Sequence, residues 1–372
     1  MRRQRDCCWQ AWLSISISGG HPELPSRDKV REQRKTVRGA KGSPRHKLDA
    51  EPAIGVVGMG LMGISISACL LGAGHKLCCV ESDPTKLRST RRRLLQVLKD
   101  AASQGLIGEA PSVLIGRVSI SGELASLKDA EVVIESTTED LPVKLRVIEG
   151  IEQVVSSKAL IGSNTSAIPV TDLQSKARHP ERILGLHWAE PANITRFMEI
   201  ICGKNTSLAN ARKAERLARR WGKEPSLLRR DIRGFITNRI MYAMIREAFH
   251  LVESGFATVA DVDRSLRNDL GYWITFAGPF RFMDLTGIPA YATVMRELLP
   301  DLSLATGVPR LMKKLVRSGA RGVSNAKGFY RYTPAQAKRW ERLFIEFSYK
   351  IRALAGEYPE DAGDRKRSKR PA

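Results

Sequence analysis

The chain has 372 residues, a length that accommodates two domains with additional terminal segments. Hydrophobic residues make up 42% and charged residues 27%, which is ordinary for a soluble globular protein, and the absence of any run of about 18 apolar residues excludes a membrane-spanning helix. The formal net charge of +22 favours anionic small molecules as partners, whereas no nucleic-acid-binding fold is recognisable in the sequence.

Residues 1–52 carry clusters of arginine and lysine and no hydrophobic pattern that could join a core. We predict a basic, disordered extension there. A secretory signal is not favoured because polar residues interrupt the weakly apolar stretch 7–17. An organelle transit peptide and a start codon placed too far upstream both stay open. The six cysteines show no metal-ligand spacing, which predicts no metal site and a reducing, cytoplasmic setting.

From residue 53 to 233, short apolar strands alternate with helices. The strands are expected at 54–57, 76–80, 131–134, 160–162 and 183–186, with helices at 61–73 and 84–103 among the segments between them. Such alternation predicts a parallel sheet covered on both faces, and therefore an α/β domain of the Rossmann type.

The first expected strand stops at a glycine-rich turn that opens a helix. The turn consists of Gly58, Met59, Gly60, Leu61, Met62 and Gly63. In this context the first glycine permits the turn, the second lets the backbone approach a pyrophosphate, and the third lets helix and strand pack closely. The helix N-terminus adds free N–H groups, so the segment predicts a dinucleotide site.

Glu81 ends the second expected strand, about 20 residues further on, where a ribose-binding carboxylate is expected. A carboxylate there accepts hydrogen bonds from the ribose hydroxyls and repels a 2′-phosphate, which predicts NAD rather than NADP. The nearby Lys86, Arg88 and Arg91 weaken that distinction.

His187 follows the strand 183–186 and precedes a proline-containing loop, at the carboxyl end of a strand, where sites in open α/β sheets gather. Removing hydride from an alcohol requires a base for the hydroxyl proton, and histidine is the usual choice near neutral pH. Glu199 lies in the apolar run 197–201. It is either a carboxylate that orients His187 or an outward-facing strand residue, and the sequence leaves both interpretations open.

Past residue 234 the strand signals fade. A long helix is expected over 235–254, followed by helices at 259–268, 279–286, 289–299 and 309–317. We therefore predict an all-α domain over 234–332. Residues 333–372 are expected to add an amphipathic helix and a basic tail.

Three further segments, 163–166, 185–191 and 234–239, agree in order and spacing with the L-3-hydroxyacyl-CoA dehydrogenase family, which the chain resembles from residue 54 to 332. The resemblance implies a helical domain of the 6-phosphogluconate dehydrogenase C-terminal type. It also implies an enzyme of fatty-acid β-oxidation that oxidises a 3-hydroxyacyl-CoA with NAD, and a homodimer joined through the helical domains.

The resemblance assigns His187 as catalytic base and Glu199 as its carboxylate partner. Ser166 is expected to bond the substrate oxygen and Asn238 to hold the thioester carbonyl, with the substrate in the cleft between the domains. The cofactor-binding residues implied are Gly58, Gly60, Leu61, Met62, Gly63, Glu81, Glu139, Lys144, Ser166 and Glu190.

The sequence departs from the family in several places. Glu190 stands where family members commonly have asparagine, and Ser324 where a lysine is often found. The CoA-contacting residues have no clear match along 86–103, where Arg92, Arg93 and Lys99 either contact CoA or belong to a solvated helix face. Tyr272, Trp273 and Phe276 could shape an acyl pocket or pack the core. Two alternatives therefore stay open: a dehydrogenase of a non-CoA 3-hydroxy acid or carnitine-like alcohol, and a non-catalytic NAD-binding regulatory protein.

Overall fold

The computed structural model describes residues 52–358, so the extension predicted over most of 1–52 and the basic tail after 358 lie outside the described residues. Within them the chain divides into two compact units. One is formed by residues 52–249 together with 308–357, and the other by residues 250–307.

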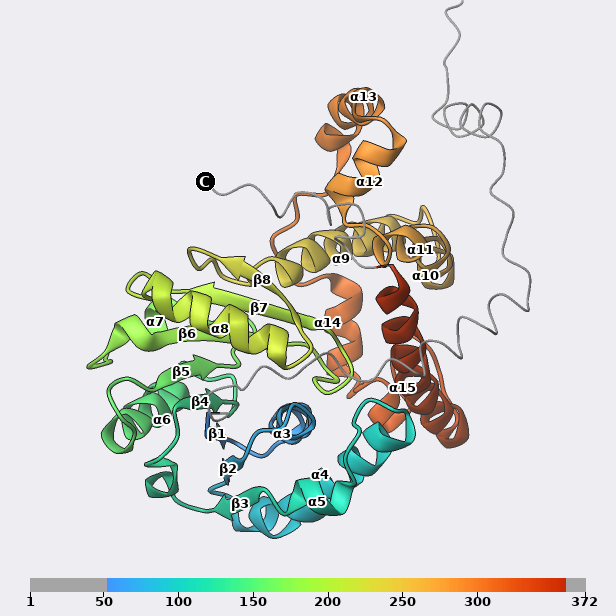
Figure 1. The fold of residues 1–372 in the computed structure, drawn as a ribbon. Coiled ribbons are helices and arrows are strands. Elements are labelled where there is room, and N and C mark those ends of the chain that lie inside the picture. Colours follow the sequence, from blue (N-terminus) through green and yellow to red (C-terminus); the bar gives the residue numbers. More distant parts are fainter. Residues whose placement is uncertain (1–51, 359–372) are drawn as a thin grey trace, which may run out of the picture. The chain divides into compact units, whose positions relative to one another are not determined.

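The first unit contains an eight-stranded sheet in the order β3-β2-β1-β4-β5-β6-β7-β8 (Figure 1). The strands are β1 (Ile54–Val57), β2 (Leu77–Val80), β3 (Val118–Ser121), β4 (Val132–Glu135), β5 (Leu160–Ser163), β6 (Ile183–Trp188), β7 (Phe197–Cys202) and β8 (Glu224–Leu228). The strand order reverses direction at β1, which lies between β2 and β4, and the carboxyl ends on either side of such a switch point form the ligand crevice of open α/β sheets.

The predicted parallel sheet is confirmed except at one pair, since β6 and β7 are antiparallel. The loop 189–196 turns the chain back directly beside β6, without the helical crossover that a parallel pair requires. All the other neighbouring pairs are parallel.

Helices cover both faces of the sheet, as predicted. They are α3 (Leu61–Gly72), α4 (Pro84–Ser103), α5 (Pro111–Ile115), α6 (Leu141–Val154), α7 (Val170–Leu173) and α8 (Leu208–Arg220), with 3-10 turns at Leu124–Leu127 and Pro180–Arg182. One apolar cluster packs α3, α4 and α8 against the sheet, and a second packs α6 and α7. Val56 and Val57 of β1 belong to different clusters, because successive side chains of a strand point to opposite faces.

The residues around its start explain why helix α4 begins where it does. Pro84 occupies the first helical position, and the Asp83 side chain accepts hydrogen bonds from the backbone N–H groups of Thr85 and Lys86. Its buried residues recur at helical spacing, ending with Leu98 and Ala101 in the last turns.

The remaining elements are helical. They are α9 (Thr237–Glu253), α10 (Val259–Asn268), α11 (Leu270–Ile274), α12 (Pro279–Thr286), α13 (Ile288–Leu298), α14 (Arg310–Arg317) and α15 (Pro334–Glu357), with 3-10 turns at Leu299–Asp301 and Val323–Asn325. Helix α9 starts later than expected because Phe235 has a φ of 52°, outside the helical range. Over the stretch 52–358, none of the helices combines the length and the apolar character needed to cross a membrane.

Candidate active site

The glycine-rich turn between β1 and α3 has the geometry that its spacing predicts. Gly58 has a φ of +91°, and a Cβ there would lie 2.6 Å from the Ser136 carbonyl oxygen. A Cβ on Gly63 would lie 1.9 Å from the Gly58 carbonyl oxygen, so only glycine allows α3 to start so close to β1. At Gly60, by contrast, a Cβ would meet nothing within 4 Å. The open space beside Gly60 fits a pyrophosphate that approaches the backbone.

The N-terminus of α3 has no side-chain cap, so its first N–H groups are available to an anion. The buried Glu81 lies beside this turn: its Oε2 accepts a hydrogen bond from the Met59 N–H at 2.9 Å, and its Oε1 accepts one from the Asp83 N–H at 3.0 Å. The structure therefore brings the predicted ribose acid and the predicted phosphate turn together.

Arg93 of α4 binds the carbonyl group of the same residue, because its Nη2 donates to the Met59 carbonyl oxygen. The Arg93 Nε is buried, and it has no hydrogen-bond partner among residues 52–358. The sequence predicted Arg93 only as a possible CoA contact, and nothing local distinguished it from Arg92.

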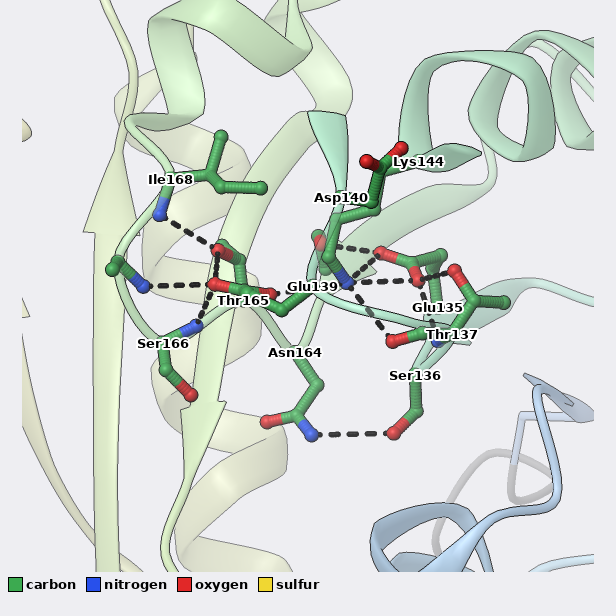
Figure 2. Close-up of polar contacts among 12 residues, drawn as sticks. Glu135, Ser136, Thr137, Glu139, Asp140, Lys144, Asn164, Thr165, Ser166 and Ile168 are labelled. Carbon is green, nitrogen blue, oxygen red and sulfur yellow. Dashed lines mark hydrogen bonds and ion pairs between the residues drawn. The ribbon is translucent and has the colours of Figure 1, made fainter. Parts of the chain in front are cut away.

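Glu135, the last residue of β4, is a functional candidate that the sequence analysis missed. Its carboxylate is fully buried and lies 3.0 Å from the fully buried Nζ of Lys144 through both oxygens (Figure 2). It also accepts hydrogen bonds from the Thr137 backbone N–H and hydroxyl and from the Ser163 hydroxyl. A glutamate that ends an apolar strand was the available signal, and the strand expected at 131–134 stopped one residue short of it.

The predicted cofactor residue Glu139 connects this buried pair to the loop after β5. Its Oε2 lies 3.6 Å from the Lys144 Nζ, and its Oε1 accepts hydrogen bonds from the Thr165 hydroxyl, the Ser166 N–H and the Ala167 N–H (Figure 2). Burial alone raises the pKa of Glu139, but these hydrogen bonds and the Lys144 charge outweigh it and lower the pKa overall.

Asn238, in the first turn of α9, donates from Nδ2 to the Ser166 carbonyl oxygen at 2.8 Å. Asn164 joins two further segments, because it donates to the hydroxyl of Ser136, which follows β4, and accepts from the N–H of Trp188, the last residue of β6. The structure thus brings the predicted residues Ser166 and Asn238 together, next to the carboxyl ends of β4, β5 and β6.

His187 and Glu199 face each other as directly paired residues of β6 and β7. The His187 Nδ1 lies 2.8 Å from the Glu199 Oε2, and since a carboxylate only accepts, Nδ1 is the donor. The Glu199 side chain is 1% exposed, so the interpretation of Glu199 as an outward-facing residue is wrong. Phe197 and Phe235 pack against the imidazole with ring centroids at 5.4 and 5.6 Å.

The second oxygen of Glu199 fixes the start of α9. Its Oε1 accepts hydrogen bonds from the Ile236 N–H at 3.2 Å, the Thr237 N–H at 2.9 Å and the Thr237 hydroxyl at 3.2 Å. Burial raises the pKa of Glu199, but the hydrogen bonds from His187 and Thr237 outweigh it, so the pKa lies below its usual value and the group is a carboxylate at neutral pH.

The residues that mark departures from the family lie at different places. Glu190 is exposed in the loop after β6. The Ser324 hydroxyl donates to the Arg321 carbonyl oxygen within its own turn. In the second unit Trp273 stacks on Phe282 with ring centroids 4.2 Å apart, whereas Tyr272 is exposed.

An open α/β sheet with a glycine-rich turn at its switch point and a buried histidine–carboxylate pair near the carboxyl end of another strand of the same sheet is typical of an NAD-dependent dehydrogenase. Residues 53–232 match the NAD binding domain of 3-hydroxyacyl-CoA dehydrogenase, and residues 234–332 match its C-terminal domain. The chain therefore belongs to the 3-hydroxyacyl-CoA dehydrogenase family and is an NAD-dependent oxidoreductase, which confirms the predicted family, fold class and cofactor.

Individual relatives differ in substrate. The chain is 30% identical over 287 residues to a 3-hydroxybutyryl-CoA dehydrogenase of Mycobacterium tuberculosis, covering 76% of this chain and 99% of the relative. It is 30% identical over 322 residues to an L-carnitine dehydrogenase of Staphylococcus epidermidis, covering 84% and 97%. Among solved structures it is similar to the NAD+ dependent 5-formyl-3-hydroxy-2-methylpyridine 4-carboxylic acid 5-dehydrogenase, with a TM-score of 0.77, 27% identity and coverage of 83% and 99%.

Proposed function

We propose that the protein oxidises the 3-hydroxy group of a short-chain 3-hydroxyacyl-CoA to a ketone, with NAD as the acceptor. The observation that carries this proposal is the buried His187–Glu199 pair, 2.8 Å apart at the carboxyl end of β6. The reaction balances with two transfers from the alcohol: the hydroxyl proton goes to the enzyme, and the hydride goes from C3 to the nicotinamide. The similarity to a 3-hydroxybutyryl-CoA dehydrogenase supports the choice of substrate.

The residues proposed to hold NAD line the carboxyl ends of the strands. The turn with Leu61, Met62 and Gly63 would donate backbone N–H groups to the pyrophosphate, and Glu81 would accept from the adenosine ribose. Glu139 would accept from the nicotinamide ribose. Because the Lys144 ammonium is held by Glu135, we propose that Lys144 acts through Glu139 and not by direct contact with NAD. Glu190 is proposed to lie close to the nicotinamide.

When bound, NAD supplies the hydride acceptor. We propose that His187 Nε2 takes the hydroxyl proton, because Nδ1 donates to Glu199 and leaves the Nε2 lone pair free. Glu199 then stabilises the imidazolium. Ser166 and Asn238, joined by their hydrogen bond, are proposed to orient the substrate hydroxyl and the thioester carbonyl.

The test is NADH formation with a panel of 3-hydroxyacyl-CoA esters of increasing chain length. We expect turnover highest with the short chains, and we expect His187→Ala to lower kcat by about 10² to 10⁴-fold while NAD still binds. The exposed His179, replaced by alanine, serves as the matched control. Absence of turnover with every ester, or near-full turnover by His187→Ala, would contradict the proposal.

A second candidate is oxidation of a carnitine-like alcohol without CoA. The exposed carboxylate of Glu190, three residues after His187, would attract a quaternary ammonium group and disfavour an anionic one. The similarity to an L-carnitine dehydrogenase supports it. L-Carnitine in the same assay separates the two, and Glu190→Asn should then shift selectivity toward the CoA ester. The alternative of a non-catalytic regulatory protein is disfavoured by the intact His187–Glu199 geometry.

We also propose that the helical elements form a homodimer interface. Between residues 250 and 307 only Ala277 is buried, and large apolar side chains such as Phe280, Leu285 and Ile288 are more than half exposed. So little burial cannot stabilise these helices alone, and a second copy of the chain would cover them. Sedimentation equilibrium should give twice the monomer mass; a monomer at micromolar concentration would contradict this. A cytoplasmic location stays a prediction.

A further inference from the structure

The loop 189–196 joins the strand that carries His187 to the strand that carries Glu199. Its position therefore bears on how the two side chains face each other. Asn193 ties the loop to α3, because its N–H donates to the Ser65 hydroxyl at 3.1 Å and its Oδ1 accepts from that hydroxyl at 2.7 Å. Two cations hold the carbonyl groups of the same loop.

The first cation is Lys223, which precedes β8 and is 4% exposed. Its Nζ donates to the carbonyl oxygens of Ala192 and Thr195 and lies 4.9 Å from the ring centroid of Trp188. Among residues 52–358 no carboxylate forms an ion pair with it, so carbonyl dipoles and an aromatic face balance the charge. Burial, and to a lesser degree the charge of Arg352, lowers the pKa of Lys223.

The second cation is Arg352 on α15, whose Nη1 donates to the Ile194 carbonyl oxygen. Ile194 is buried, so this carbonyl group has no ready access to water. Helix α15 begins at Pro334, after the family match ends at residue 332, but it lies in the same compact unit as the loop. A segment outside the matched domains therefore reaches the backbone of the loop that follows His187.

We infer that Lys223 and Arg352 are positioning residues that hold the loop 189–196, and that α15 is thereby part of the catalytic unit. Neither side chain is assigned a contact with substrate; both act through the loop on His187 and Glu199. Charged hydrogen bonds to buried carbonyl groups are stronger than neutral ones, so they suit this role. The expected effect on kcat rests on the proposed function, whereas the positioning of the loop by Lys223 and Arg352 does not.

The first experiment measures the loop without reference to activity. Hydrogen–deuterium exchange of the loop amides is compared between the wild type, Arg352→Met and the control Arg339→Met, which changes an exposed arginine of the same helix. We expect exchange of the Asn193, Ile194 and Thr195 amides to rise about tenfold or more in Arg352→Met only. Equal exchange in the three proteins overturns the inference.

The second experiment measures kinetics with whichever alcohol the wild type oxidises. Arg352→Met should lower kcat about tenfold, since a misplacement of about 1 Å can cost up to about 10²-fold, while the dissociation constant for NADH stays within about twofold. Arg352→Lys should restore part of kcat. If Arg352→Met instead caused a general loss of structure, NADH binding would weaken and Arg352→Lys would not restore kcat. That result would count against the inference.

Lys223→Met provides a second variant, because methionine fills the buried site without the charge. Its effect on loop exchange should be smaller in the Arg352→Met background than in the wild type, since both residues hold one loop. Additive effects would contradict the inference. If no alcohol is oxidised but Arg352→Met still accelerates loop exchange, the proposed function fails and the inference stands.

Discussion

Replacing Glu199 by glutamine changes one oxygen of the side chain into an amino group, and the surroundings of Glu199 determine which one. The Oε1 position receives three donors: the backbone N–H groups of Ile236 and Thr237 and the Thr237 hydroxyl. The Oε2 position faces only the His187 Nδ1, at 2.8 Å. The amide oxygen must therefore take the three-donor side, because an amino group there would face donors. The amino group then points at His187.

An amino group opposite Nδ1 requires Nδ1 to accept, so the imidazole proton moves to Nε2, the atom proposed to take the substrate proton. Loss of a general base lowers rates by about 10² to 10⁴-fold, and the same exchange in a Ser-His-Asp triad lowers kcat by about 10⁴-fold through the wrong tautomer. We expect kcat of Glu199→Gln to fall about 10³-fold. The N-terminus of α9 keeps its acceptor, so the protein should remain folded.

The assay is initial NADH formation with the substrate that the wild type prefers, together with NADH binding by fluorescence titration. A matched control is Glu181→Gln, which changes an exposed carboxylate 3.5 Å from the exposed His179. The control should keep kcat, and both variants should bind NADH as the wild type does. A folded Glu199→Gln protein with kcat within about threefold of wild type would refute the assignment of His187 and Glu199 as a working pair.

Three further predictions concern the cofactor half. Arg93→Met removes the charged donor to the Met59 carbonyl oxygen and should raise the NADH dissociation constant about tenfold, with the exposed Arg92→Met as control; a change under about twofold argues against it. Glu81→Ala should relax the preference for NAD over NADP in kcat/KM, and an unchanged ratio counts against the ribose role. The pKa of Glu139 is lowered below 4.5, so the contribution of its carboxylate to stability is present above about pH 4.5 and is lost as the pH falls further. In urea unfolding, the wild type should therefore lose more stability on acidification than Glu139→Gln. Equal losses in the two proteins would contradict this prediction.

Much of the fold follows from local signals. Helix α4 matches its expected range 84–103 because Asp83 and Pro84 act within one turn of its start. The strands β3 and β8 were not predicted, because only the first residue of Val118–Ser121 and the last of Glu224–Leu228 are buried. Strands this exposed at the edges of a sheet contain no apolar run, and whether they form depends on pairing with the neighbouring strand.

The sequence allowed candidate site residues to be named one by one, but it did not give the contacts between them. His187 and Glu199 could be singled out in the sequence. That they face each other, however, depends on the antiparallel register of β6 and β7, which the local sequence does not determine. Glu135 could have been noticed as a glutamate that ends an apolar strand, but its pairing with Lys144 requires β4 and α6 to be placed first. Tertiary packing therefore supplies what distinguishes a direct cofactor contact from a residue that supports one.

In both Glu139 and Glu199, the two carboxylate oxygens have different kinds of partner. In each, Oε1 accepts from backbone N–H groups of a loop or helix start, whereas Oε2 faces a basic side chain, Lys144 in one case and His187 in the other. An amide can keep the first role and lose the second, but alanine loses both. At each position the alanine variant should therefore unfold at lower urea concentration than the glutamine variant, while at Glu199 the two should lose kcat to a similar degree. If alanine and glutamine were equally stable at both sites, the backbone contacts would not be what places these loops.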